Sequence, residues 1–127
     1  MERLTTNKPV SEMEWFELVH NCCYADENRS ARYRDFTDDI DARELARKLM
    51  YMYGEWEIDN DAMLSDEIFD FEMADNLRYG IEEMKGLIAQ FYLHLWVMAE
   101  LREGLKYWED LEEQGLLLKL PCKPKLQ

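Results

Sequence analysis

The sequence predicts a small, mainly α-helical domain of about four helices, with one long C-terminal helix and a short strand or extended C-terminal tail. Apolar residues recur at helical spacing in several segments. Ser, Thr or Asp precedes these segments, and glycine follows two of them. With 127 residues, 47% of them hydrophobic, the chain has enough apolar material for one core. We expect a single helical domain over residues 1–115 and an extended tail over residues 116–127.

The first helix is expected to begin near Ser11 and to end between Tyr24 and Asp26. The run SEME at 11–14 matches a capping box between Ser11 and Glu14. Cys22 or Cys23 is expected to pack in the core. Residues 26–38 lack a helical stripe, and they predict a loop or a short hairpin.

The second helix is expected from about Asp39 to Tyr53, with Gly54 just after its end. Its N-cap is expected to be Thr37, Asp38 or Asp39. Its predicted apolar face consists of Leu45, Leu49, Met52 and Tyr53, with Ala42 and Ala46 beside them. The side chains expected to face water are Asp41, Arg43, Glu44, Arg47 and Lys48.

The third helix is expected to start at Ser65 or Asp66 and to run to Leu77 or Tyr79. Acidic residues in its first turn favour the positive end of the helix dipole. A weak apolar stripe is formed by Ile68, Phe71, Ala74 (or Asp75) and Leu77.

The last helix is expected from Ile81 to Gln114, because this segment lacks proline and ends at Gly115. Its apolar positions are 84, 87, 88, 91, 95, 98, 101, 105, 108 and 111. Such a helix is roughly 50 Å long, whereas a domain of this size is less than about 40 Å across. The helix must therefore project, kink near Gly104 or pair with another chain.

The stretch 87–99 is apolar on nearly every side, and only Gln90 and His94 interrupt it. This predicts burial on all sides, either at the centre of the domain or in a homodimer interface. Phe91, Leu95, Met98 and Leu105 are the expected self-association residues. His94 is expected to be a packed core histidine, with a titrating functional role as the alternative. The stretch is too short to span a bilayer, so no membrane partner is expected.

Acidic residues are concentrated in one part of the chain. The net charge is −13, and residues 55–83 carry eleven acids and one base. This charge argues against direct nucleic-acid binding and against binding to anionic membranes. It indicates docking to another protein that has a basic surface. The candidate partner-binding residues are Glu55, Glu57, Asp59, Asp61, Asp66, Glu67, Asp70, Glu72 and Asp75, with Trp56 and Phe69 as apolar contacts.

A second hypothesis is based on the most basic segment of the chain. Arg29, Arg32 and Arg34, with Tyr33 among them, suit an anion-binding loop in a nucleotide sponge or a small enzyme. The alternative for the same arginines is ion pairing with the acidic segment of the same chain. A third hypothesis is a scaffold protein that self-associates through residues 87–108.

The sequence contains none of the phosphate-loop, zinc-protease or serine-hydrolase motifs, so neither an enzyme nor a cofactor is expected. His20, Cys22 and Cys122 lack the paired spacing of a zinc site, and no metal is expected. The three cysteines are an odd number and no secretory signal precedes them. A reducing cytosol fits this pattern.

Several runs carry a resemblance to a known group: ERLTTNKPVSEM, HNCCYAD, ARYRDF, DIDARELARKLM and LIAQFYLHLWVMAELREGLKYWEDLEEQGLLLKLPCK. They resemble small proteins of unassigned activity encoded by phages and prophages of gut Firmicutes. The similarity covers the two ends of the chain better than residues 55–80. It implies a phage protein in the host cytoplasm, and small phage proteins of this kind often inhibit a host defence factor, in the manner of anti-CRISPR or anti-restriction proteins.

Overall fold

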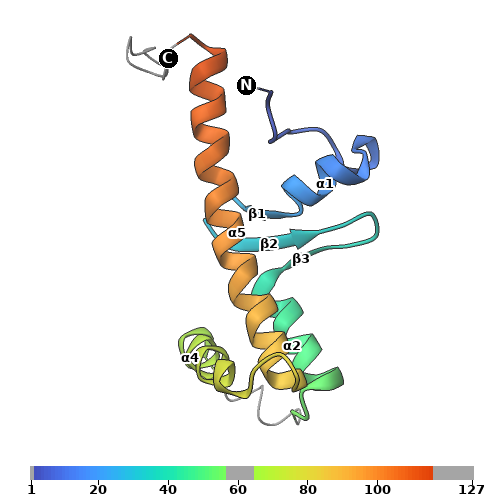
Figure 1. Ribbon diagram of the computed structural model, residues 1–127, viewed down its shortest axis with the longest axis vertical. Helices are drawn as coiled ribbons and strands as arrows, with labels where there is room; N and C mark the ends of the chain where they lie inside the picture. Colours follow the sequence, from blue (N-terminus) through green and yellow to red (C-terminus); the bar gives the residue numbers. More distant parts are fainter. Residues whose placement is uncertain (1, 57–64, 116–127) are drawn as a thin grey trace.

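The computed structural model describes residues 2–56 and 65–115, and within them it shows a mainly α-helical fold with one small antiparallel sheet (Figure 1). In chain order the elements are η1 (Val10–Glu12), α1 (Trp15–Asn21), β1 (Cys23–Ala25), β2 (Ala31–Arg34), β3 (Asp39–Asp41), α2 (Ala42–Tyr53), α4 (Asp66–Asn76), η2 (Leu77–Tyr79) and α5 (Met84–Glu113). The predicted fold class is confirmed. The predicted tail at 116–127 lies outside the described residues, so the division of the chain at residue 115 stays a prediction.

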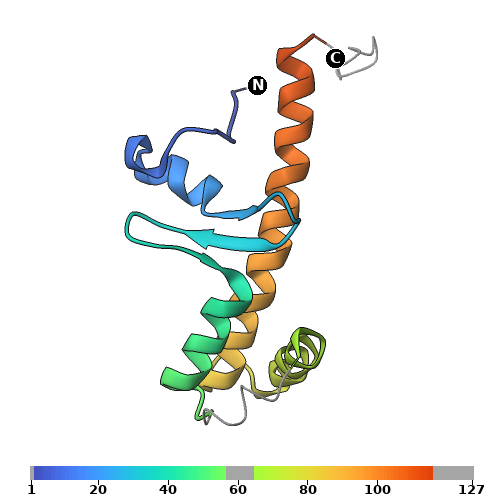
Figure 2. The same ribbon diagram turned by 180° about the vertical axis from the view of Figure 1, so that it is seen from behind.

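The long helix α5 is the axis of the molecule, and the predicted long C-terminal helix is confirmed. Its 30 residues extend about 45 Å at 1.5 Å per residue. The helix runs through Gly104 without a break, so the chain does not use the kink that the sequence allowed. The sheet, α1 and α2 lie on one side of α5, and α4 lies beside its lower end on the other side (Figures 1 and 2).

The sheet has the strand order β1-β2-β3, with both pairs antiparallel. Residues 26–38, predicted as a loop or short hairpin, therefore belong to a three-stranded sheet that spans 23–41. Ala31 and Tyr33 face α5: Ala31 is buried, and the Tyr33 ring meets Phe91 edge-on at 6.0 Å. Because side chains alternate along a strand, Arg32 and Arg34 lie on the opposite face of the sheet.

The core joins α2, α4 and α5 around Phe69. The Phe69 ring packs edge-on to Tyr92 at 5.4 Å and to Trp56 at 5.6 Å between ring centroids. The buried residues of the core cluster are Ala31, Ala42, Ala46, Met50, Phe69, Met73, Ile88, Tyr92, Leu95 and Ala99.

The apolar face predicted for α2 is wrong in part. Leu45 and Leu49 pack at the border of the core, but Met52 and Tyr53 are 57% and 51% exposed. The buried stripe is instead formed by Ala42, Ala46 and Met50. The two alanines are small, so α2 can approach its neighbours closely. The N-cap is Asp41, not Thr37, Asp38 or Asp39, because β3 runs to Asp41 and α2 begins only at Ala42. The Asp41 side chain accepts hydrogen bonds from Arg43 N and Glu44 N.

The start predicted for α4 is confirmed, with Ser65 as its N-cap, and the helix ends at Asn76, where the 3-10 turn η2 continues to Tyr79. The predicted apolar stripe of α4 is wrong. Ile68 and Phe71 are exposed, whereas Phe69 and Met73 are fully buried. Two apolar stripes run along this helix, and hydrophobicity alone does not choose between them. The aromatic contacts of Phe69 select the buried one.

The start predicted for the first helix is also wrong. Residues 10–12 form a single 3-10 turn, and α1 begins at Trp15 and ends at Asn21. The capping box is formed by Glu14 and Glu17, with the Glu17 carboxylate accepting a hydrogen bond from Glu14 N at 3.2 Å. Glu14 takes the extended cap conformation that the prediction had assigned to Ser11.

Candidate functional site

Two acids of the predicted partner-binding segment are occupied within the chain. Asp70 accepts from Arg43 Nη2 at 2.6 Å and from Arg43 Nε at 3.0 Å. Asp66 lies 3.3 Å from Arg47 Nη2 and 3.6 Å from Arg43 Nη1. Arg43 and Arg47, which were expected to face water, are thus half-buried against α4. The positive charges of α2 neutralise the side of α4 that faces them.

Asp70 is held in its charged form. Burial by itself raises the pKa of Asp70, but hydrogen bonds from Arg43 and from the Tyr92 hydroxyl at 2.5 Å outweigh this effect and leave the pKa below its ordinary 3.8. Burial and the same hydrogen bond raise the pKa of Tyr92. Asp70 therefore links three helices and is not available for a partner.

The remaining described acids of the segment face solvent. Glu55, Glu67, Glu72 and Asp75 are exposed, and Asp75 lies 3.6 Å from the exposed Arg78. Glu57, Asp59 and Asp61 lie outside the described residues. The predicted acidic set is thus divided by the orientation of α4 into an inner, paired group and an outer, exposed group.

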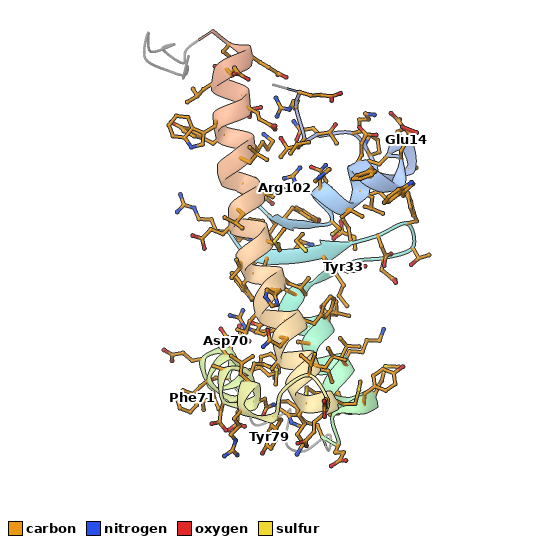
Figure 3. The ribbon with its side chains drawn as sticks, viewed as in Figure 1. Glu14, Tyr33, Asp70, Phe71, Tyr79 and Arg102 are labelled. Atoms are coloured by element: carbon orange, nitrogen blue, oxygen red, sulfur yellow. The ribbon has the colours of Figure 1, made fainter. Side chains whose placement is uncertain are left out.

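The outer side of α4 combines charge with apolar contact area. Ile68 is 49% exposed and Phe71 is 74% exposed, and Phe71 lies on the side of α4 away from α5 (Figure 3). These residues alternate with exposed carboxylates along the same arc of the helix. We define the acidic face of α4 as Glu67, Ile68, Phe71, Glu72 and Asp75.

The two apolar residues predicted to contact a partner are placed differently. Phe69 is fully buried in the core, and Trp56 is half-buried against it. Phe71 is the exposed aromatic that the sequence analysis missed as a contact residue, because it had been assigned to the buried stripe. Phe71 has an acid on either side in the sequence, Asp70 and Glu72. Two acidic neighbours do not indicate which side of the helix packs against the core.

The arginines of the predicted anion-binding loop do not converge. Arg32 Nε donates to Asp39 at 2.9 Å, and Arg34 Nε donates to the backbone oxygen of Asn21 at 2.9 Å. The Arg34 guanidinium also lies 4.2 Å from the ring centre of Tyr24. Tyr33 is on the other face of the sheet and donates to Asp35 at 3.0 Å. The neutralising partner of Arg32 is thus Asp39, not the acidic segment named in the alternative prediction.

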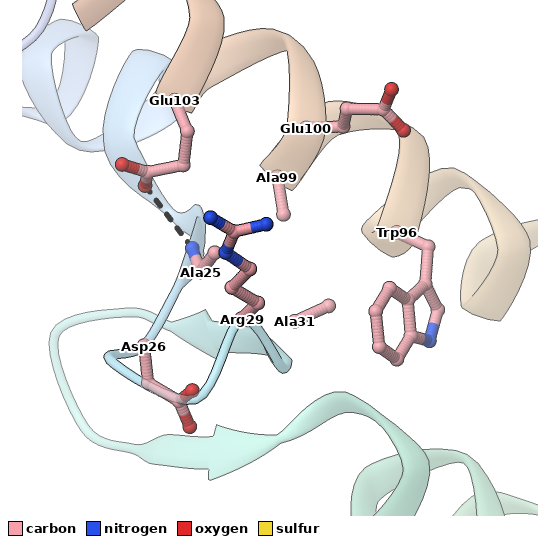
Figure 4. A pocket seen from close by; sticks show the side chains of 8 residues that line it. All are labelled: Ala25, Asp26, Arg29, Ala31, Trp96, Ala99, Glu100 and Glu103. Carbon is pink, nitrogen blue, oxygen red and sulfur yellow. Dashed lines mark hydrogen bonds between the residues drawn. The ribbon is translucent and has the colours of Figure 1, made fainter. Parts of the chain in front are cut away.

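Arg29 lies apart from these residues, in a pocket of about 530 Å³ between the β1–β2 turn and α5 (Figure 4). Glu103 on the wall of this pocket accepts a hydrogen bond from Ala25 N at 3.1 Å. Asp26, Glu100 and Glu103 all line the pocket with Arg29. Glu103 is paired with Arg102 at 2.7 Å. Asp26 and Glu100 still outnumber Arg29, so the pocket is acidic and does not suit an anionic ligand.

Within one chain, residues 87–99 are not buried on all sides, so the alternative that places them at the centre of the domain is wrong, whereas burial in a homodimer interface stays a prediction. Among the predicted self-association residues, Leu95 is buried in the core of its own chain, Phe91 and Met98 are 37% and 47% exposed, and Leu105 is half-buried. His94 is exposed, with its Nδ1 2.7 Å from the Gln90 carbonyl oxygen, so it is not a core histidine. The other described elements therefore leave part of the surface of α5 uncovered.

Cys22 and Cys23 are both free and half-buried, with their sulfur atoms 3.8 Å apart, and Cys23 packs against the core. Within residues 2–56 and 65–115, no group of three or more His, Cys, Asp or Glu side chains is placed to hold a metal ion. In the same part of the chain, no helix is both long enough and apolar enough to cross a membrane.

The chain was compared with known protein families, with curated proteins and with solved structures, and none of the three comparisons finds a match.

Proposed function

We propose that this protein is an acidic binding protein that docks on the basic surface of another protein through the acidic face of α4. The observation that carries the proposal is the composition of that face: Phe71 is 74% exposed between Glu67 and Glu72. An exposed aromatic is costly to leave in water, and it is a common anchor in protein interfaces.

The charge of the chain supports the same function. The net charge of −13 attracts a basic surface over a distance and raises the rate of encounter. Exposed carboxylates on one side of a helix can form ion pairs with a row of positive side chains that normally contact the phosphates of a nucleic acid. Phe71 and Ile68 then supply the contacts that hold the complex together.

The narrower proposal is that the partner is a host defence factor and that the protein is a phage-encoded inhibitor acting in the bacterial cytoplasm. It is supported by the resemblance to phage and prophage proteins and by the acidic surface. Proteins that bind nucleic acid, such as restriction enzymes and RNA-guided nucleases, present basic grooves of the matching sign.

The experiment is a capture of host proteins by the immobilised chain, at low and at high salt, from a nuclease-treated lysate. The test variant neutralises Glu67, Glu72 and Asp75 as Gln, Gln and Asn. The matched control replaces Glu12, Glu27 and Glu112 by Gln, which removes the same charge from exposed positions elsewhere.

We expect one captured protein to be retained by the control, lost with the test variant and released by high salt. The purified partner should then lose its affinity for nucleic acid when the chain is added. Equal capture by both variants would contradict the role of the acidic face. A captured protein whose nucleic-acid binding is unchanged would contradict the inhibitory role.

A further inference from the structure

A second apolar surface runs along α5, separate from the acidic face. We define the α5 stripe as Met84, Leu87, Phe91, His94, Met98, Leu101, Leu105 and Trp108. These positions follow one another in alternating steps of three and four residues, which is the spacing of the seam in a coiled coil.

Most of the α5 stripe lies outside the core of its own chain, although the Phe91 ring meets Tyr33 edge-on at 6.0 Å. Its six large exposed hydrophobic side chains are between 37% and 60% exposed, His94 is exposed, and Leu105 is half-buried. The inward side of α5 is formed by a different set that includes Ile88, Tyr92 and Ala99. In both ribbon views, the upper half of α5 is open on the side away from α1 and the sheet (Figures 1 and 2).

The α5 stripe is also uncharged. The residues on its outer flank, Gln90, Val97 and Gly104, carry no charge either, in a chain in which 34% of the residues are charged. A basic protein could form ion pairs with the acidic parts of the surface, but it could form none with the α5 stripe. A second uncharged seam of the same spacing is the complementary surface, and a second copy of this chain supplies one.

We infer that α5 pairs with α5 of a second copy, in antiparallel orientation, through the α5 stripe. The spacing is symmetric about position 96, so antiparallel helices place every stripe residue opposite another. The layers are Met84 with Trp108, Leu87 with Leu105, Phe91 with Leu101, and His94 with Met98, each formed twice. Every residue of the stripe thus has a partner residue, as a two-fold interface requires.

Parallel pairing of the same stripes is less favourable. It would place His94 against His94 and Trp108 against Trp108 of the second copy, which buries two imidazoles together and crowds two indoles. It would also bring the two 65–83 segments, each with seven acids and one base, to the same end of the pair. Antiparallel pairing separates these segments by the length of the seam.

The size of the surface fits a stable dimer. Eight side chains with about half of their surface exposed offer roughly 700 Å² per copy, close to the about 800 Å² per partner of a standard interface. The α5 stripe extends from residue 84 to residue 108, which is about 36 Å along the axis of α5.

The first test is the mass in solution, measured by sedimentation equilibrium of the full chain over a range of concentrations. We expect twice the 15.3 kDa of one chain. Leu101→Glu should raise the dissociation constant at least about a hundredfold, because the dimer then buries two unpaired carboxylates. The matched control is Val19→Glu, since Val19 is 59% exposed, almost the same as Leu101, and lies on α1 and not on α5. It should remain dimeric.

Both substituted side chains are exposed in the single chain, and an unchanged far-UV spectrum establishes that each variant is folded. A wild-type chain that stays monomeric at all concentrations would overturn the inference and leave the α5 stripe to a helix of another protein. If both substitutions weakened the dimer equally, the inference that the α5 stripe is the dimer interface would be overturned.

The second test addresses the orientation. Leu87→Glu and Leu105→Lys are made as separate variants, and each alone should be mainly monomeric. When the two are mixed, an antiparallel pair places the new Glu opposite the new Lys, so a heterodimer should form. Parallel pairing predicts no such rescue, and a mixture that stays monomeric would overturn the antiparallel order. Neither test involves the acidic face or its partner, so failure here leaves the proposed function standing, and the reverse is also true.

Discussion

Arg43 of α2 and Asp70 of α4 form a two-bond ion pair, 27 residues apart in the chain, and Tyr92 of α5 donates to the same carboxylate. One acid of the segment that the sequence assigns to a partner thus holds three helices of its own chain together. The pair lies on the inward side of α4, and Phe71 and Glu72 face outward.

Loss of this pair should destabilise the fold. Arg43→Met should lower the free energy of unfolding by about 1–2 kcal/mol, because Asp70 loses two hydrogen bonds while water still screens its partly exposed carboxylate. Urea unfolding followed by far-UV circular dichroism measures the change. The control is Arg78→Met, which breaks the exposed pair with Asp75 and should cost less than about 0.5 kcal/mol. Equal losses for the two variants would contradict the role of the inner pair.

The buried side chain of Asn21 should be a second point of high sensitivity. Its oxygen accepts from Arg102 Nε at 2.9 Å and from Thr6 N at 3.1 Å, and its amide donates to the carbonyl oxygens of Leu4 and Glu17. Asn21→Ala should lower the free energy of unfolding by about 3 kcal/mol, since it leaves several buried groups unpaired.

The same substitution should release the N-terminal arm, so hydrogen exchange at Thr5 and Thr6 should become faster than in the wild-type protein. Asn28→Ala, at an exposed position in the β1–β2 turn, is the control and should change neither measurement. Retained protection of Thr5 and Thr6 in the Asn21 variant would show that other contacts anchor the arm.

Stability should fall in acid through Glu109. Burial raises the pKa of Glu109, but hydrogen bonds from Thr5 and from the Leu4 backbone outweigh it and leave the pKa below its ordinary 4.5. A carboxyl group with a lowered folded-state pKa contributes stability that is complete above 4.5 and is lost as pH falls through the folded-state pKa.

Glu109→Gln should therefore be less stable than wild type near neutral pH and should lose less stability on acidification below pH 4.5. Urea unfolding at several pH values tests this slope. Glu112→Gln changes an exposed neighbour on α5 and should keep the wild-type slope. A wild-type slope in the Glu109 variant would assign the acid sensitivity to other carboxylates.

Two glycines of α5 should respond in opposite directions to alanine. A Cβ at Gly86 would collide with the backbone of Gly80, where the chain turns into α5, so Gly86→Ala should cost more than about 3 kcal/mol. A Cβ at Gly104 meets no atom within 4 Å, and Gly104→Ala should stabilise the helix by about 0.5–1 kcal/mol. Thermal unfolding measures both changes, and a tolerated Gly86→Ala would show that the turn before α5 can shift.

The helices with strong end signals were predictable from local sequence. These signals act within a few residues of the helix ends that they mark. They are Ser65 before the acids of α4, Gly54 after α2, and the proline-free run that ends at Gly115. For the same reason the sequence analysis missed the three-stranded sheet. Its strands of three and four residues are too short for a clear alternating pattern, and they form by pairing with one another.

The sequence by itself determined that the chain is helical, acidic and rich in apolar stripes, because these properties depend on composition and on spacing along one element. Only the tertiary structure decided which stripe is buried and which carboxylates stay free. On α4, the stripes of Phe69 and Phe71 are similar in hydrophobicity, and the contacts of Phe69 with Trp56 and Tyr92 choose between them. That choice turns Asp70 toward Arg43 and Glu72 toward solvent, and local sequence contains no information about either neighbour.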